Sequence, residues 1–436
     1  MSSPSYSQTV VHGDSLRDAC TYQDPDPKFL LVGEDRAGAP SRIPVGEQLL
    51  SRHMLLMGGI GTGKSNAFHF LIRNLRSSLT GQDVMIIFDT KGDYYKTFYR
   101  PGDVVISNDE HAAGAQGADY WNLFEEISVD GRAEENALEI ANALFEDRLR
   151  QSSQPFFPNA AKDLFGAVLL HLLRTDAMAR CRNNADLRSI FDTFSVEAMK
   201  RILAAHPDLK ALRAYIEDER SGQTLGVVSE LQQLVREIFV GNFKKKGALS
   251  MRRLVREKGA KVVFVEYDLG LGSTLTPIYK LLFDLAIKEA LCRKENEGSV
   301  YFIIDEFRLL PNLHHIDDGV NFGRSLGAKF VAGVQNVDQI SAAYGPNLAK
   351  SILSGFGTNI SFRVSDANSR EYVKGLYGGN MQLHTYLSAV QSRGISEELR
   401  EGSVIDDVDI TSLGVGEAIV GILNCPPFYF KFNRFA

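Results

Sequence analysis

One short turn constrains this chain more than any other feature, and it lies within "MLLMGGIGTGKSNAFHFLIRNL", residues 54–75. Gly58-x-x-x-x-Gly63-Lys64-Ser65 has the spacing of a phosphate-binding loop, with a strand-like apolar run before it and a helix-like pattern after it. Glycines let the backbone turn its N–H groups toward phosphate oxygens, and the helix N-terminus adds its dipole. Lys64 is expected to reach the β- and γ-phosphates, and Ser65 to bind Mg²⁺. The predicted nucleotide contacts are Gly58, Gly59, Ile60, Gly61, Thr62, Gly63, Lys64 and Ser65.

Length and composition favour a soluble chain with more than one domain. The 436 residues, 44% of them apolar, exceed the usual range for a single domain, so two or three domains are expected. No apolar run approaches the roughly 18 residues needed to span a bilayer, and the chain as given is expected to be soluble. The four cysteines lie far apart without a Cys-x-x-Cys pair, which is typical of ordinary thiols in a reducing cytosol.

The charge distribution argues against a protein that coats nucleic acid through overall basicity. The formal net charge is −6. The run from Arg236 to Lys261 nevertheless has nine Lys or Arg against two Glu. This run is either a local nucleic-acid surface or a solvated face of a loop and helix, and the second interpretation is the commoner one for such runs.

The apolar pattern predicts an α/β chain that is interrupted by helices. Strand-like runs within residues 28–57 lead into the phosphate-binding loop, a helix is expected over 64–79, and "DVMIIFD" follows as a buried strand. Such a strand–helix–strand unit implies a parallel sheet. Further strand signals lie at 103–108, 260–268, 299–307, 328–336, 358–364 and 416–423.

These patterns predict three parts. Residues 1–27 are expected to form a flexible N-terminal segment. Residues 28–119 and 240–436 are expected to form one nucleotide-binding domain with a central, mostly parallel sheet. Residues 120–239 show only 3.6-residue periodicity and predict an all-α domain that interrupts it. No internal repeat and no low-complexity tract is visible.

A second motif supplies the acidic groups that a phosphate-binding loop requires. The apolar run in "VYFIIDEF" predicts a buried strand that delivers Asp305 and Glu306 to its C-terminal end, where open α/β sheets bind ligands. Asp305 is expected to hold Mg²⁺, directly or through water, and Glu306 to polarise the attacking water. An acidic pair at a strand end is common, so the prediction depends on its combination with the loop.

Two further polar residues belong to the expected catalytic set. Gln335 ends the apolar run "AKFVAGVQ" and is predicted to contact the γ-phosphate or the attacking water, although a strand-terminal Gln also faces solvent in many proteins. Arg324 lies between the two strand signals, and an arginine donated across a subunit boundary would neutralise transition-state charge. From spacing alone, a surface position for Arg324 is the commoner outcome.

Other polar residues leave alternatives open. Asp89, Lys91 and Asp93 end the strand after the phosphate-binding loop, and they either contribute to the nucleotide's surroundings or close a turn. The adjacent His314 and His315 cannot present both rings to one metal from a helix face, so they are expected at the surface rather than in a metal site.

Several motifs taken in order resemble the cytoplasmic part of type IV coupling proteins, the TraD/TrwB-type conjugative DNA-transfer ATPases of the HerA/FtsK superfamily. The resemblance covers roughly residues 28–430. It implies a RecA-like P-loop domain, an all-α domain, ATP and Mg²⁺ as cofactors, and a homohexamer around a DNA channel. The motifs are "RHMLLMGGIGTGKS", "MIIFDTKGDY", "YWNLFEE", "PFFPNAAKDLFGAVLLHLLR", "VYFIIDEFRLLP", "GRSLGAKFVAGVQNVDQISAAYG" and "GFGTNISFRVSDANSREYVKGLYG".

The resemblance also assigns roles to individual positions. It implies Lys64 and Ser65 as nucleotide contacts, and Asp305 and Glu306 as the metal and water residues. It implies Gln335 as the sensor. It makes Arg324 the leading arginine donated in trans, with Arg52, just before the phosphate-loop strand, as a second candidate.

The function implied is ATP-driven DNA translocation that delivers transferred DNA and its relaxase to a type IV secretion channel. The expected location is cytoplasmic, at the cytoplasmic face of the bacterial inner membrane. Members of the family usually begin with a two-helix membrane anchor, and some carry a long C-terminal tail. Neither is visible in the 436 residues given, so the inner membrane is expected as a partner only if an anchor is missing from this chain. The alternatives are a HerA-like motor that acts with a nuclease in end resection or phage defence, and a nucleotide-gated adaptor that recruits protein substrates.

Overall fold

The computed structural model describes residues 6–109, 119–193, 195–294, 297–387 and 395–435. Its internal contacts divide the chain into two compact units. Unit 1 comprises Met1–Thr80, Tyr301–Pro311 and Asp317–Ala436, and unit 2 comprises Gly81–Val300 and Asn312–Ile316. The predicted boundaries at 28–119, 120–239 and 240–436 group residues by type of secondary structure instead, and they stay a prediction.

Unit 1 contains a mixed sheet with the strand order β3-β2-β14-β13-β10-β4-β9-β8. β4 is parallel to β10 and β9, whereas β10–β13, β13–β14, β14–β2 and β2–β3 are antiparallel pairs. The strands are β2 (Pro27–Glu34), β3 (Pro40–Gly46), β4 (Met54–Met57), β8 (Val300–Ile304), β9 (Ala328–Val334), β10 (Thr358–Ser361), β13 (Glu417–Ile422) and β14 (Phe428–Phe432).

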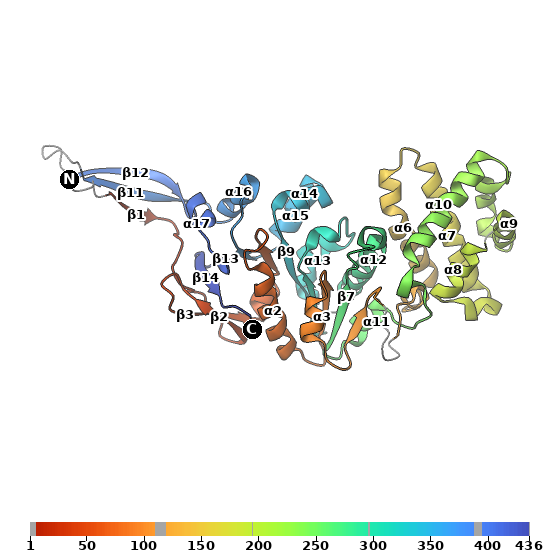
Figure 1. Ribbon diagram of the computed structural model, residues 1–436, viewed down its shortest axis with the longest axis horizontal. Coiled ribbons are helices and arrows are strands. Elements are labelled where there is room, and N and C mark those ends of the chain that lie inside the picture. Colours follow the sequence, from red (N-terminus) through yellow and green to blue (C-terminus); the bar gives the residue numbers. More distant parts are fainter. Residues whose placement is uncertain (1–5, 110–118, 194, 295–296, 388–394, 436) are drawn as a thin grey trace. The chain divides into compact units, whose positions relative to one another are not determined.

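Helices cover this sheet and join its strands. All residues of β4, β8 and β9 are buried, which explains why their sequences are continuous apolar runs rather than alternating ones. α14 and α15 lie side by side (Figure 1). The helices are α1 (Glu47–Leu50), α2 (Lys64–Ser78), α13 (Ile316–Phe322), α14 (Val337–Tyr344), α15 (Pro346–Ser354), α16 (Ala367–Gly375) and α17 (Asp407–Thr411), with 3-10 turns η4 (Phe307–Leu309) and η5 (Gly323–Leu326).

A separate three-stranded antiparallel sheet in unit 1 was not predicted. Its order is β1-β11-β12, from Tyr6–His12, Gly379–Leu387 and Ile395–Ser403, so β1 lies within the segment that was predicted to be flexible. Side-chain amides contribute to it: Gln8 of β1 donates to the buried Gln382 of β11 at 2.7 Å, and Gln382 donates to the buried Asn380 of the same strand at 2.8 Å. Because its inner residues are polar, the sequence lacks the apolar alternation that signals a strand.

Unit 2 combines a small parallel sheet with a helical segment. The strands run β5-β7-β6, from Val84–Asp89, Lys261–Glu266 and Val104–Ile106. Between β6 and β7, the described residues from 123 to 257 form helices, and α7 packs against both α6 and α10 (Figure 1). The helices are α3 (Asp93–Phe98), α5 (Leu123–Ile127), α6 (Ala133–Gln151), α7 (Phe156–Arg174), α8 (Asn184–Asp192), α9 (Val196–Ala204), α10 (Gly222–Ile238), α11 (Met251–Glu257) and α12 (Gly272–Leu291), with 3-10 turns η1 (Asp176–Cys181), η2 (Pro207–Ile216) and η3 (Gly241–Lys244).

A buried carboxylate ties the two ends of the helical segment together. Glu126 is fully buried and accepts hydrogen bonds from Trp121 Nε1 at 2.8 Å, from Ser250 Oγ at 2.8 Å and from the backbone N–H of Arg252 at 3.1 Å. Burial raises the pKa of Glu126, while these donors act in the opposite direction. The chain thus enters and leaves this segment at neighbouring points.

Long apolar helices are absent from the described part of the chain. None of its helices is both long and apolar enough to cross a membrane.

Candidate functional site

The phosphate-binding loop joins the C-terminal end of β4 to the first turn of α2. Gly61 and Gly63 have φ of +75° and +107°, a left-handed conformation that favours glycine. Thr62 Oγ1 donates to the carbonyl of Gly59 at 2.8 Å across the turn. Lys64 opens α2 with only 8% of its surface exposed. All predicted contacts from 58 to 65 therefore belong to one strand–loop–helix turn.

Two residues outside the predicted site, Gly416 and Phe432, support the backbone of the loop. The backbone N–H of Gly416 donates to the carbonyl of Thr62 at 2.8 Å, and that of Phe432 donates to the carbonyl of Gly416 at 2.8 Å. A Cβ on Gly63 would lie only 2.8 Å from the Cα of Gly416. The glycine-rich sequence around 414–416 was the only local signal of this contact.

This contact gives the first prediction. Gly63→Ala is expected to weaken binding of a fluorescent ADP analogue by at least about tenfold, because a left-handed non-glycine residue costs ~1–2 kcal/mol before the clash with Gly416 is added. The control is Gly61→Ala. Gly61 also has a positive φ, but a Cβ added there would lie in open space. Equal losses in fluorescence titrations of the two variants would show that Gly416 does not set the loop conformation.

The acidic pair lies beside the loop. Asp305 follows β8, and Ser65 Oγ donates to Asp305 Oδ2 at 3.2 Å. Asp305 is 7% exposed. A hydroxyl and a carboxylate at this spacing are the hard oxygen ligands that suit Mg²⁺, so the residues present fit the predicted metal.

Glu306 and Gln335 also come together. β8 and β9 are neighbours in the sheet, and Gln335 Nε2 donates to Glu306 Oε2 at 3.0 Å. The other carboxylate oxygen accepts a hydrogen bond from Arg308 Nε at 2.9 Å. Arg308 was not among the predicted site residues, although it lies only two residues after Glu306 in the sequence.

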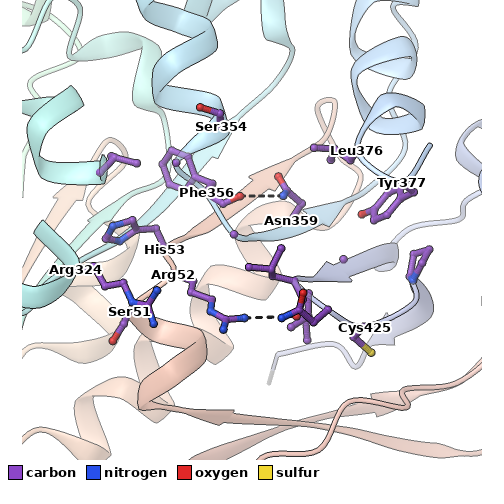
Figure 2. Close-up of a pocket in the computed structure, with 18 of the residues that line it drawn as sticks. Ser51, Arg52, His53, Arg324, Ser354, Phe356, Asn359, Leu376, Tyr377 and Cys425 are labelled. Atoms are coloured by element: carbon purple, nitrogen blue, oxygen red, sulfur yellow. Dashed lines mark hydrogen bonds between the residues drawn. The ribbon is translucent and has the colours of Figure 1, made fainter. Parts of the chain in front are cut away.

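The two predicted arginines lie elsewhere in unit 1. Arg52, just before β4, and Arg324, in η5 before β9, line a cavity of about 760 Å³ (Figure 2). The loop follows the other end of β4, and Gln335 follows the other end of β9. β4 has four residues and β9 has seven, so the two ends of these strands lie roughly 13 Å and 23 Å apart, respectively. The structure therefore does not bring either arginine to the loop of its own subunit.

The same cavity contains a buried histidine. His53 is 1% exposed, has φ of +57° and accepts a hydrogen bond at Nδ1 from the backbone N–H of Phe330 at 3.1 Å. Burial lowers its pKa to about 4, so the ring is neutral near pH 7. Figure 2 shows His53 on the same side of the cavity as Arg52 and Arg324.

Ion pairs occupy much of the basic run at 236–261. This arrangement favours the solvated-face interpretation over a free basic surface for DNA. The pairs are Arg236–Asp192, Lys246–Asp186, Arg252–Asp130, Arg252–Glu289, Arg253–Glu125 and Arg256–Glu289.

The contacts of Asp89, His314 and His315 bear on the roles that the sequence left open for them. Asp89 accepts a hydrogen bond from the backbone N–H of Tyr95 at 2.8 Å, which fits the closure of a turn, and burial raises its pKa. His314 Nε2 lies 2.8 Å from Glu146, and His315 Nδ1 lies 3.6 Å from Asp284. No metal-ligating cluster of three such side chains occurs in the described ranges.

Comparison with known families decides where this site belongs. Residues 39–400 match the family described as the type IV secretion-system coupling protein DNA-binding domain. The chain belongs to this family. The coupling protein TraD of Escherichia coli (strain K12) is 23% identical over 410 residues, which are 89% of this chain and 54% of TraD. The chain thus spans about half the length of this curated relative.

Solved structures of a coupling protein share the fold. The unbound monoclinic form of TrwB lacking 70 N-terminal residues has a TM-score of 0.74 and 19% identity, over 95% of this chain and 90% of that one. TrwB in complex with ADP and Mg²⁺ has a TM-score of 0.73 and 17% identity, over 100% and 97%. The predicted RecA-like P-loop fold is therefore confirmed for this member of the coupling-protein family.

Proposed function

We propose that this coupling-protein family member is a Mg²⁺-dependent ATPase that couples hydrolysis to DNA translocation. In this role it delivers transferred DNA and its relaxase to a type IV secretion channel during conjugation. The observation that carries the proposal is the meeting of Ser65 with Asp305, and of Glu306 with Gln335, at the strand ends beside a phosphate-binding loop. TraD is named a coupling protein, and TrwB has been solved with ADP and Mg²⁺.

The loop and the acidic pair divide the work of phosphoryl transfer. The backbone N–H groups of residues 58–65 hold the phosphates, and Lys64 pairs with their outer oxygens. Ser65 and Asp305 would hold Mg²⁺, and the bound ion would neutralise phosphate charge. The short distance between their oxygens, 3.2 Å, fits two ligands of one cation.

Glu306 acts on the attacking water. Its carboxylate orients and polarises that water, and Gln335 fixes the carboxylate through its amide at 3.0 Å. Gln335 in turn accepts a hydrogen bond from Gln339 of α14 at 3.4 Å. Through these two hydrogen bonds, Gln335 connects the water-activating Glu306 to α14, as a sensor would.

The arginines imply an assembly of several subunits. Arg324 and Arg52 lie at the strand ends away from their own loop, so we place them against the nucleotide of a neighbouring subunit in a homohexamer. Arg324 is exposed and is the first candidate for the arginine finger. Arg52 is half-buried, donates to the carbonyl of Leu423 at 3.5 Å and is the second candidate. The DNA passes through the channel of this ring at the cytoplasmic face of the inner membrane.

A combined hydrolysis and translocation assay tests this function. Purified protein is expected to hydrolyse ATP faster with duplex or single-stranded DNA, and to displace a third strand from triplex DNA only when ATP and Mg²⁺ are present. Hydrolysis that DNA does not stimulate would favour the nucleotide-gated adaptor. Plasmid transfer from donor cells that lack the gene separates a conjugative role from a HerA-like role in resection or defence.

Glu306→Gln separates binding from chemistry. It is expected to bind ATP and Mg²⁺ normally but to lose at least about a hundredfold in turnover, because an amide cannot act as a base. Asp305→Asn is expected instead to raise the Mg²⁺ concentration that gives half-maximal activity. Turnover and Mg²⁺ titrations measure both effects, with the exposed Glu371→Gln as the control. Identical behaviour of the two site variants would contradict the division of roles.

A further inference from the structure

Arg308 contacts the water-activating residue, and the roles proposed above do not use it. After β8 the chain enters the 3-10 turn η4, which the backbone N–H of Leu309 closes by donating to the carbonyl of Glu306 at 3.1 Å. The turn folds the second residue after Glu306 back toward it. Arg308 Nε consequently lies 2.9 Å from Glu306 Oε1.

The two partners of Glu306 differ in charge and in anchoring. Gln335 offers a neutral amide from the end of a buried strand, and its own oxygen accepts a hydrogen bond from Gln339. Arg308 offers a full positive charge from a side chain that is 46% exposed. The contact to Gln335 is therefore fixed by the fold, whereas the contact to Arg308 can open into solvent.

A cation at this distance opposes the chemistry that Glu306 performs. A carboxylate activates water through its negative charge, and a guanidinium 2.9 Å away stabilises that charge without taking part in the reaction. When the ion pair opens, Arg308 no longer stabilises the negative charge of Glu306, and the carboxylate can polarise the attacking water more strongly.

We propose that Arg308 is a positioning residue that restrains Glu306 between turnovers. The pair holds the carboxylate against η4, and hydrolysis proceeds from the fraction of subunits in which the pair is open. This inference rests on the proposed ATPase function and adds a residue that sets its basal rate.

The exposure of Arg308 limits the strength of the restraint. Partly exposed ion pairs change an equilibrium by about fivefold at most, and salt screens them. The restraint therefore lowers basal turnover severalfold and does not switch it off.

The test is steady-state ATP hydrolysis without DNA, at low salt and at a protein concentration above the assembly threshold. Arg308→Ala and Arg308→Gln are expected to raise kcat about two- to fivefold with an unchanged KM for ATP. Arg308→Lys keeps the charge and is expected to keep most of the restraint. The matched control is Arg400→Ala in β12. Arg400 also pairs with a glutamate two residues away, Glu398, at 2.6 Å, but outside the site.

Salt supplies a second measurement that a merely structural role would not change. Wild-type kcat is expected to rise with KCl toward the Arg308→Ala value, while the variant shows no such rise. An unchanged or lower kcat in both Arg308→Ala and Arg308→Gln would overturn the inference. Failure of the ATPase proposal would look different, because wild-type protein would then show no turnover that Lys64→Ala removes.

Discussion

Lys64→Ala is expected to abolish ATP turnover and leave the fold intact. Lys64 is the first residue of α2, directly after the loop, and is 8% exposed; a lysine at this position neutralises phosphate charge in the transition state. Loss of one such group typically costs about 10²–10³ in rate. Alanine has the highest helix propensity, so α2 is expected to keep its first turn.

Turnover, far-UV circular dichroism and thermal unfolding measure the two parts of this prediction. The control is Lys350→Ala, which removes an exposed lysine from α15. A well-folded Lys64→Ala protein with more than about a tenth of wild-type turnover would contradict the assignment of the loop.

Arg324→Ala is expected to lose about 10³–10⁵ in turnover, the usual value of an arginine finger, with nucleotide binding retained. Arg324 and the phosphate-binding loop lie at opposite strand ends of unit 1, so the loss would come from a neighbour's active site. The variant alone does not prove this, because an arginine that acts within its own subunit would give the same loss.

Mixing two inactive variants distinguishes these cases. Lys64→Ala subunits lack the phosphate lysine but still carry Arg324, and Arg324→Ala subunits have the reverse defect. In mixed rings some intact loops receive an intact arginine, so turnover is expected to return in part, with a maximum at an intermediate ratio. If mixed assembly is confirmed by crosslinking and no ratio restores activity, Arg324 does not act across subunits.

The elements that the sequence predicted best are those with local signals. β4, β5 and β8 are continuous apolar runs because both faces of each strand are buried. The loop was visible because glycine, lysine and serine occur at a fixed spacing. Glu306 and Gln335 were each identified because they end an apolar, strand-like run, and the two strands prove to be neighbours in the sheet.

The features that were missed depend either on residues far apart in the sequence or on a turn that leaves no periodic signal. β1 pairs with β11, more than 360 residues away, and the buried side chains of β11 include the amides Asn380 and Gln382. Gly416 behind the loop has no motif of its own. Arg308 is close to Glu306 in sequence, but its contact depends on the 3-10 turn that follows β8, and apolar periodicity does not indicate such a turn.

The support of the loop by Gly416 has a consequence for the synthesis of the protein. Thr62 is synthesised long before its partner Gly416 and the strand residue Phe432, which lie several hundred residues further along the chain. Chains are synthesised at about 5–20 residues per second, and contacts of high sequence separation form late. A nascent chain therefore carries the glycine-rich motif for tens of seconds before the motif can hold a nucleotide. Nucleotide binding in this protein would thus report that synthesis has passed Phe432.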